Sequence, residues 1–147
     1  MRSRMRLAAT LTLAGLTGAL LPATSAGAQG CGPVRLPTFH VHVHAEREVV
    51  RAGNAAGLEV SVARHVAHND VAGAQDANVL VIIEIGRTRV GEGALTDAGG
   101  LAPISVDLPR NVGTGLADVT VLAWKEAGPC AEEYGETVAR GLFRVRK

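Results

Sequence analysis

Short runs in which apolar and polar residues alternate recur along this chain, and turn residues separate them. Phe39 to Ala45 reads Phe-His-Val-His-Val-His-Ala, and Ile104 to Leu108 alternates in the same way. A two-residue period predicts a strand that buries one face, because successive side chains of a strand point to opposite sides. Val79 to Ile85 is almost continuously apolar and β-branched, which predicts a central strand buried on both faces. The chain is therefore expected to fold into sheets.

No segment sustains the period of an amphipathic helix, and the 18 glycines disfavour helices further. About seven short strands, separated by turns, predict an all-β fold in the form of an antiparallel β-sandwich. Polar and turn residues over 68–73 and 128–133 predict loops there. The expected strands lie at 39–45, 58–62, 79–85, 104–108, 118–124 and 138–145, with a glycine-broken stretch after residue 85.

The first 28 residues have the layout of a secretory signal peptide. Three arginines within the first six residues precede a mostly apolar run, Leu7 to Leu21, and small residues end at Ala26-Gly27-Ala28. That order is typical of an export signal with an A-x-A-like cleavage site. The apolar run is too short to span a membrane, and no later stretch reaches the ~20 apolar residues required. We expect a signal peptide over 1–28, an extended lead-in over 29–38 and one domain over 39–147.

The exported part of the chain, 119 residues from Gln29 to Lys147, carries 12 basic and 14 acidic residues. This mildly acidic balance, with only four aromatic side chains, excludes the basic footprint and the stacking platform of nucleic-acid binding. Thirteen arginines against two lysines in the whole chain are typical of a GC-rich bacterial genome. We expect a periplasmic or extracellular protein whose partner is another protein or a cell-envelope polymer.

The chain has two cysteines, Cys31 and Cys130. An even count in an exported chain favours a disulfide, which would join the N-terminal segment to a position 99 residues later. The alternative is lipidation of Cys31 as the first residue of a lipoprotein. The sequence before it, Ala28-Gln29-Gly30, lacks the usual leucine and has a large glutamine, which favours the disulfide.

Several turns and strands follow one another in a characteristic order: Arg51-Ala52-Gly53-Asn54, Thr96-Asp97-Ala98-Gly99-Gly100, the run from Ile104 to Pro109, Gly115, and the run from Asp118 to Trp124. This order resembles bacterial immunoglobulin-like domains over residues 39–145. The resemblance implies an immunoglobulin-like β-sandwich, and domains of that kind mostly bind, space or stiffen. The cysteines depart from the antibody pattern, because neither lies in one of two facing core strands.

Three histidines alternate with valines in the segment from His40 through His42 to His44. Residues two apart on a strand share a face and lie about 6.5–7 Å apart, so the three imidazoles should form one outward strip. His65 on the next strand is expected to fall opposite His42 or His44. Two histidines of the strip together with His65 would then suit zinc or copper(II).

Two other interpretations of the histidine strip stay open. Polar side chains on an exposed edge strand discourage aggregation between sheet edges and need no ligand. Clustered imidazoles also suggest a pH-responsive face, because they would become charged together below about pH 6.5 and repel one another. Only the metal interpretation requires a defined metal stoichiometry.

The last two strand-like runs carry further candidates. Arg140, Arg144 and Arg146 should lie on the face opposite Phe143 and Val145, either solvated and paired with glutamates 46 and 48 or forming a docking face for an anionic polymer. Trp124 shares its face with two neighbours, Thr120 and Leu122. It is expected to pack on its sheet rather than to act as a ligand platform.

Residues that would support catalysis are not found. The exported chain has two serines, Ser61 and Ser105, and neither lies in a Gly-x-Ser-x-Gly elbow. Gly91-Glu92-Gly93 lacks the helix that a phosphate-binding loop requires, and Asp97 alone is too few carboxylates for calcium. We therefore expect a non-catalytic binding or structural module with no cofactor, and the alternative is a secreted metal-binding protein that uses the histidine strip.

Overall fold

The computed structural model describes residues 34–67 and 70–147. The chain divides into two units, residues 1–30 and 31–147. The predicted signal peptide and Cys31 both lie outside the described residues. All the elements of the described part are strands: β1 (Val34–Leu36), β2 (Phe39–Ala45), β3 (Val49–Arg51), β4 (Ala55–Ala67), β5 (Asp70–Gly73), β6 (Asn78–Ile85), β7 (Thr88–Leu95), β8 (Leu101–Asp107), β9 (Gly115–Gly128) and β10 (Ala131–Arg146).

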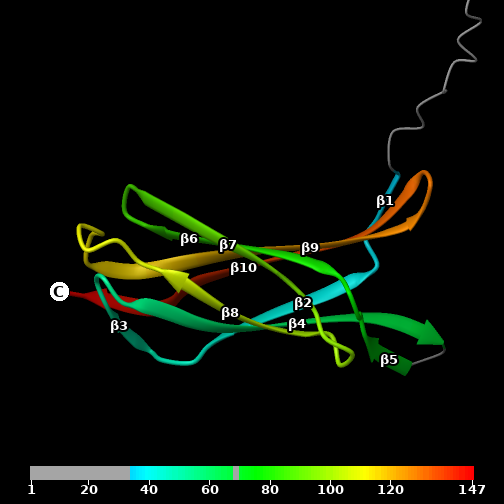
Figure 1. The fold of residues 1–147 in the computed structure, drawn as a ribbon, viewed down its shortest axis with the longest axis horizontal. Helices are drawn as coiled ribbons and strands as arrows, with labels where there is room; N and C mark the ends of the chain where they lie inside the picture. The colour runs from blue at the N-terminus through cyan, green and yellow to red at the C-terminus, as the bar shows by residue number, and fades with distance from the viewer. Residues whose placement is uncertain (1–33, 68–69) are drawn as a thin grey trace, which may run out of the picture. The chain divides into compact units, whose positions relative to one another are not determined.

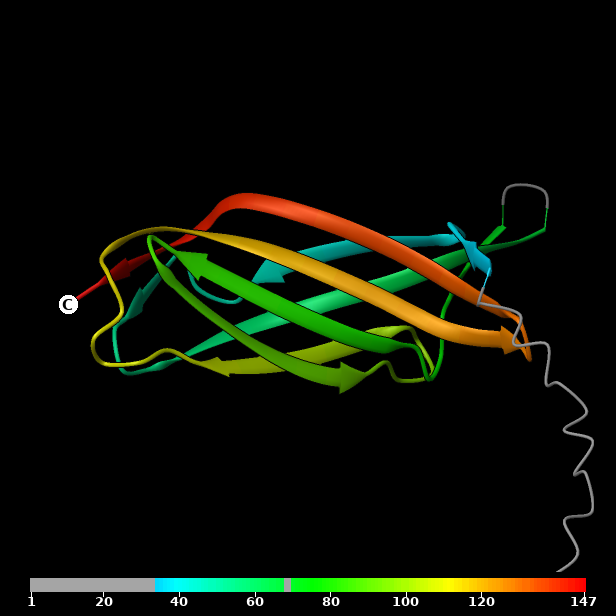
Figure 2. The ribbon, with the colours of Figure 1, turned by 90° about the horizontal axis from the view of Figure 1, so that it is seen from above.

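The strands form two sheets, which lie one over the other in Figures 1 and 2. The six-stranded sheet has the order β1-β10-β9-β6-β7, and β3 also pairs with β10. The four-stranded sheet has the order β2-β4-β5, and β8 also pairs with β4. The prediction of an all-β fold with two packed sheets is therefore confirmed. The six-stranded sheet is mixed, since β1 and β3 pair with β10 in parallel.

Ten strands replace the expected seven or so. Three of them, β1, β3 and β5, are only three or four residues long and lack a readable alternation. β5 occupies part of the predicted loop over 68–73, because it pairs with the end of β4. The predicted loop over 128–133 is a tighter hairpin, in which Glu132 and Glu133 already belong to β10.

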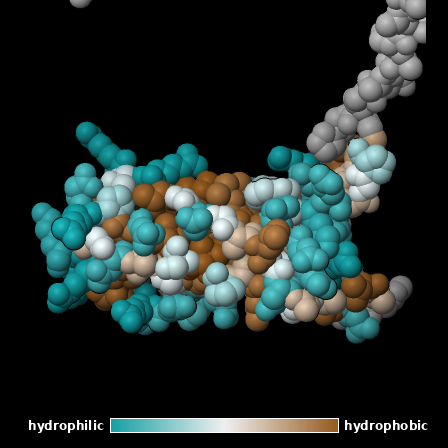
Figure 3. All heavy atoms as spheres, viewed as in Figure 1, coloured by the Kyte–Doolittle hydropathy of each residue, from teal (hydrophilic) through white to brown (hydrophobic). Residues whose placement is uncertain are grey.

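The core lies between the sheets and consists of the side chains that point inward at every second position of the strands. Val79, Val81 and Ile83 of β6 are at most 2% exposed, and they belong to one buried cluster with the inward side chains of β4, Leu58, Val60 and Val62. The other half of β6 differs from the prediction of a strand buried on both faces. Leu80 and Ile82 are only half-buried, because none of the described strands covers that side of the sheet. In Figure 3, hydrophobic residues gather in the middle of the sandwich and hydrophilic residues over both ends.

The predicted turn over 96–100 fastens the two sheets. Asp97 Oδ1 accepts hydrogen bonds from the amides of Gly99 (2.8 Å) and Leu101 (2.9 Å). The buried Thr96 hydroxyl accepts the amide of Ala77 at 2.9 Å and donates to the carbonyl of Ala74. The turn therefore satisfies buried backbone groups and holds the start of β8 against the segment before β6.

Candidate functional site

The outer face of the six-stranded sheet carries apolar side chains that no other layer of the described residues covers. The register places Leu80 of β6 beside Leu122 of β9, and Trp124 of β9 beside Tyr134 of β10. Opposite Leu80 on the edge strand β7 stands Gly93, which has no side chain. The apolar surface of β6 therefore stays accessible from the edge of the sheet.

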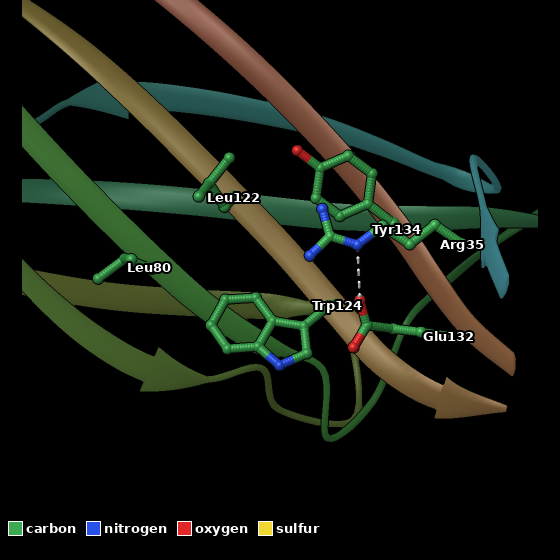
Figure 4. A pocket seen from close by; sticks show the side chains of 6 residues that line it. All are labelled: Arg35, Leu80, Leu122, Trp124, Glu132 and Tyr134. Carbon is green, nitrogen blue, oxygen red and sulfur yellow. Dashed lines mark ion pairs between the residues drawn. The ribbon is translucent and has the colours of Figure 1, made fainter. Parts of the chain in front are cut away.

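These side chains line a shallow pocket of about 230 Å³. Figure 4 shows the Trp124 and Tyr134 rings on adjacent strands, with the Arg35 side chain lying over the tyrosine. The Arg35 guanidinium carbon is 5.1 Å from the centre of the Tyr134 ring, within the range of a cation–π contact. Arg35 Nε also lies 3.4 Å from Glu132 Oε1. The pocket lining consists of Arg35, Leu80, Leu122, Trp124, Glu132 and Tyr134.

A hydrogen bond fixes the polar end of the tyrosine. The Tyr134 hydroxyl donates to Glu136 Oε2 at 2.7 Å. This bond stabilises the neutral phenol, and it is the main reason why the pKa of Tyr134 is raised, with desolvation and the Glu136 charge adding to the effect. The pocket therefore presents two aromatic faces beside an acidic rim and one arginine. Such a site can stack on flat or weakly polar ligand surfaces and donate or accept hydrogen bonds at its edge.

The first strand completes the pocket. β1 pairs in parallel with Ala131 to Glu133 of β10, and the Val34 amide donates to the Cys130 carbonyl at 2.8 Å. This pairing carries Arg35 across the tyrosine. The segment over 29–38 was expected to be extended, but its sequence does not indicate which strand it pairs with. The position of Arg35 over Tyr134 was therefore not predicted. The alternation of buried and exposed residues could have shown the aromatic pair, since Trp124 and Tyr134 both occupy outward positions in their strands.

Trp124 lies on the face predicted from its alternation with Thr120 and Leu122. The core positions of β9 are instead the small or β-branched residues that alternate with these, such as Val121 and Ala123. Trp124 is half-buried on the outside of the sheet and lines the pocket.

The histidine strip points outward from the other sheet. His40, His42 and His44 are exposed on β2, which is an edge strand that pairs only with β4. The expected position of His65 opposite His42 or His44 is wrong, since the register places Ser61 and Glu59 there. The reason is that the connection from β2 to β4 contains β3, which pairs in the other sheet, so no tight turn joins the two strands.

His65 instead lies beside His40 at the far end of β2. Their ring centroids are 4.8 Å apart and the ring planes are almost perpendicular, at 88°. Within residues 34–67 and 70–147, no group of three histidine, cysteine, aspartate or glutamate residues is arranged to hold a metal ion. The structure therefore brings two of the four predicted ligands together and leaves His42 and His44 apart from them.

The predicted disulfide cannot be described, because Cys31 lies outside the described residues. Cys130 is not a free thiol. It sits in the turn between β9 and β10, and its carbonyl accepts the amide of Val34, three residues after Cys31. The pairing with Cys31 stays a prediction, as does its lipidation.

Arg140, Arg144 and Arg146 are exposed on β10, opposite the buried Phe143 and Val145, as their alternation indicates. The expected ion pairs with glutamates 46 and 48 do not form. Instead, the Arg144 amide donates to the backbone carbonyl of Glu48 at 2.8 Å. The three ion pairs of the described residues are Arg35–Glu132, Arg64–Glu133 and Arg89–Glu84, so the three β10 arginines remain unpaired there.

Comparisons with known proteins add little. No family model and no curated protein sequence matches the chain. Among solved structures, it is similar to the sporulation control protein Spo0M of Bacillus subtilis, with 13% identity and a TM-score of 0.40. The match covers 76% of this chain and 51% of that one, so the chain spans about half the length of that structure. Within the described residues, no helix is long and apolar enough to cross a membrane.

Proposed function

We propose that this chain is an exported, non-catalytic binding or structural module of the bacterial envelope or its surroundings, with an immunoglobulin-like fold. The strand order supports the fold. In the proposed fold, the neighbours β10-β9-β6 would take the places of strands G-F-C of an immunoglobulin sandwich, and β2-β4-β8 those of A-B-E in the facing sheet. Export rests on the layout of residues 1–28.

The observation that carries the binding function is the pocket on the outer face. Two aromatic rings, Trp124 and Tyr134, lie side by side on a sheet face that the described residues leave uncovered. Aromatic side chains with a polar end are enriched where proteins bind partners, because they combine a large apolar area with hydrogen-bonding capacity. The partner that best fits an envelope protein is a cell-envelope polymer, whose sugar rings offer flat apolar faces with polar edges.

Co-sedimentation with purified bacterial peptidoglycan sacculi tests this proposal. We expect the exported chain to sediment with the sacculi, and a Trp124→Ala/Tyr134→Ala variant to stay in solution. The matched control is His42→Ala/His44→Ala, which removes two exposed rings from the other sheet and should sediment like the original chain. Equal sedimentation of all three proteins would exclude the pocket as the binding site, and no sedimentation of any would exclude this polymer as the partner.

The arginines of β10 support a second type of partner. Arg140, Arg144 and Arg146 are exposed, and Arg146 lies beside Arg51 of β3 in the parallel pair. Unpaired positive charges at one end of a sheet attract a polyanion, and the attraction weakens as salt rises. Binding of soluble polyphosphate that is lost at high salt and in Arg144→Ser/Arg146→Ser would favour this surface. Polymer binding that depends on Trp124 and resists salt would favour the pocket.

Metal binding is the remaining candidate, and the contact between His40 and His65 favours it. Two imidazoles alone leave at least two positions of a tetrahedral zinc ion to water or to a partner. Titration with Zn²⁺ should give one weak site that is lost in His40→Ala and retained in His44→Ala. Identical titrations for the two variants would exclude this pair as a metal site.

A further inference from the structure

Two histidines that touch on the outer face of the four-stranded sheet have the spacing of two ligands of one metal ion. His40 of β2 and His65 of β4 are both exposed, and their ring centroids lie 4.8 Å apart. Two imidazoles on one tetrahedral zinc ion have ring centres about 5 Å apart, because each Zn–N bond is about 2.0–2.1 Å long. Rotation of the exposed side chains can aim one nitrogen of each ring at a common point.

The rest of one copy does not complete such a site. His40 pairs with Ala63 and His42 pairs with Ser61, so His42 lies on the opposite side of His40 from His65. Ser61 and His65 are four residues apart in β4, or about 13 Å along the strand. Within residues 34–67 and 70–147, no group of three potential ligand residues could hold a metal ion. Two of the four positions of a tetrahedral zinc ion therefore stay open in one copy.

The surface around the two histidines is free of fixed charges. The outward positions beside the pair, here called the neutral patch, are His42, Ser61, Ala63 and Val71. Val71 pairs with His65 from β5 and is 54% exposed. The first charged outward residue along β4 is Glu59, which lies opposite His44. Two copies of the neutral patch can therefore meet without bringing like charges together, whichever way a two-fold axis runs through it.

A two-fold axis through the metal supplies the ligands that one copy lacks. In a two-fold interface the same surface of both copies meets, so each residue of one copy is repeated by the other. Two His40–His65 pairs then provide four imidazole nitrogens, which is a complete set for tetrahedral zinc.

We propose that a zinc ion joins two copies of this chain through His40 and His65 of each copy, with the neutral patches in contact. This inference rests on the metal site proposed above and names a second copy as the partner that completes it. The aromatic pocket stays open in such a dimer, because it lies on the other sheet.

Sedimentation velocity of the exported chain at increasing Zn²⁺ concentration tests the proposal. We expect a monomer without zinc and a dimer that is most abundant near one zinc ion per two chains. Excess zinc should disperse the dimer, because each copy then holds an ion of its own. Removal of zinc with EDTA should return the chain to the monomer.

Single variants separate the two ligands from the other histidines. His40→Ala and His65→Ala should each weaken the zinc-dependent dimer by about tenfold or more, because each removes two of its four ligands. The matched control is His44→Ala, which removes an exposed imidazole from the same strand and should leave the equilibrium unchanged.

Three results would overturn the proposal, and they differ in what they say about the metal site. A dimer that forms without zinc, or that His40→Ala does not weaken, would show that another surface joins the copies. One zinc ion per monomer, lost in His40→Ala, would remove the second copy but leave the metal site in place. No binding of zinc would remove both.

Discussion

At the scale of single residues, the fold changes the acid–base chemistry of Tyr134. Its hydroxyl donates to Glu136 at 2.7 Å, and ionisation of the phenol would replace this bond with a contact between two negative charges. The pKa of Tyr134 is therefore raised, first by the hydrogen bond and then by desolvation and the Glu136 charge. Because the folded-state pKa exceeds the unfolded one, the stabilisation is complete below the unfolded pKa and is lost as the pH rises through the folded pKa.

Tyr134 is the only tyrosine, so its titration can be followed directly by ultraviolet absorbance of the tyrosinate. We predict ionisation above the ordinary tyrosine pKa in the folded chain. Glu136→Ala should lower the pKa toward that of an exposed tyrosine, whereas Glu92→Ala on β7 should not change it. A titration at or below the ordinary value in the original chain would contradict the proposed hydrogen bond.

Thr96 is the only buried polar residue of the described part, at 2% exposure. Its hydroxyl joins the Ala77 amide to the Ala74 carbonyl. We predict that Thr96→Val lowers the free energy of unfolding by about 1–3 kcal/mol, because it leaves two buried backbone groups unpaired. Urea unfolding would measure the loss, with Thr114→Val in an exposed loop as the control. Equal stability of both variants would show that water satisfies these groups.

Among the elements, strands with a clear alternation were the predictable ones. β2, β4 and β8 fall where apolar residues recur every second position, and β6 falls where they are almost continuous. β7 was read only as a broken stretch, because Gly91 and Gly93 interrupt its pattern. β1 and β3 join β10 in parallel over a long sequence separation, and three-residue strands have too few positions to show a period.

The contacts within the candidate site were predicted less well than the strands, because they depend on pairing between residues far apart in the sequence. The alternation fixed which face Trp124, His40 and Arg144 occupy, since that depends only on local periodicity. Which strands become neighbours depends on long-range pairing, so neither the contact of Arg35 with Tyr134 nor that of His65 with His40 was predicted. Both contacts depend on the register of residues far apart in the sequence.

The turn before β8 depends on close backbone approach at Gly100. This residue has φ of +78°, and a Cβ there would lie 2.3 Å from the Val62 carbonyl oxygen and 2.7 Å from the Ala74 nitrogen. We predict that Gly100→Ala lowers the free energy of unfolding by about 2–4 kcal/mol, because both the backbone angle and the packing oppose a side chain. Gly113→Ala has open space around it and should change the midpoint of thermal unfolding little. A similar small shift for Gly100→Ala would contradict the described turn.

At the scale of the whole molecule, β10 joins strands that lie far from it in the sequence. β1 pairs with its first residues and β3 with its last ones. The position of Val34 beside Cys130 supports a disulfide between Cys31 and Cys130, which would fasten the first strand and with it Arg35 of the pocket. A loop of this length is worth up to about 4.7 kcal/mol in the chain-entropy account.

Peptide mapping of the exported protein without reduction checks this pairing. We predict a Cys31–Cys130 linked peptide, an N-terminus at Gln29, and a lower thermal midpoint after reduction. A lipid attached to Cys31, or unlinked cysteines in protein purified from the periplasm or medium, would contradict it. Cys130→Ser should reproduce the effect of reduction and should weaken the pocket by releasing β1.

The central claim is that the pocket on the outer face of the six-stranded sheet is the binding site. Trp124 is the only tryptophan, so its fluorescence reports on that pocket alone. The most direct measurement is a titration of the exported chain with soluble peptidoglycan fragments while Trp124 emission is recorded. We predict a saturable change in Trp124 emission. Tyr134→Ala should lower the affinity for the fragments at least tenfold, and His42→Ala should leave the affinity unaltered. Fragments that bind by calorimetry without changing Trp124 emission, or no binding at all, would contradict the claim.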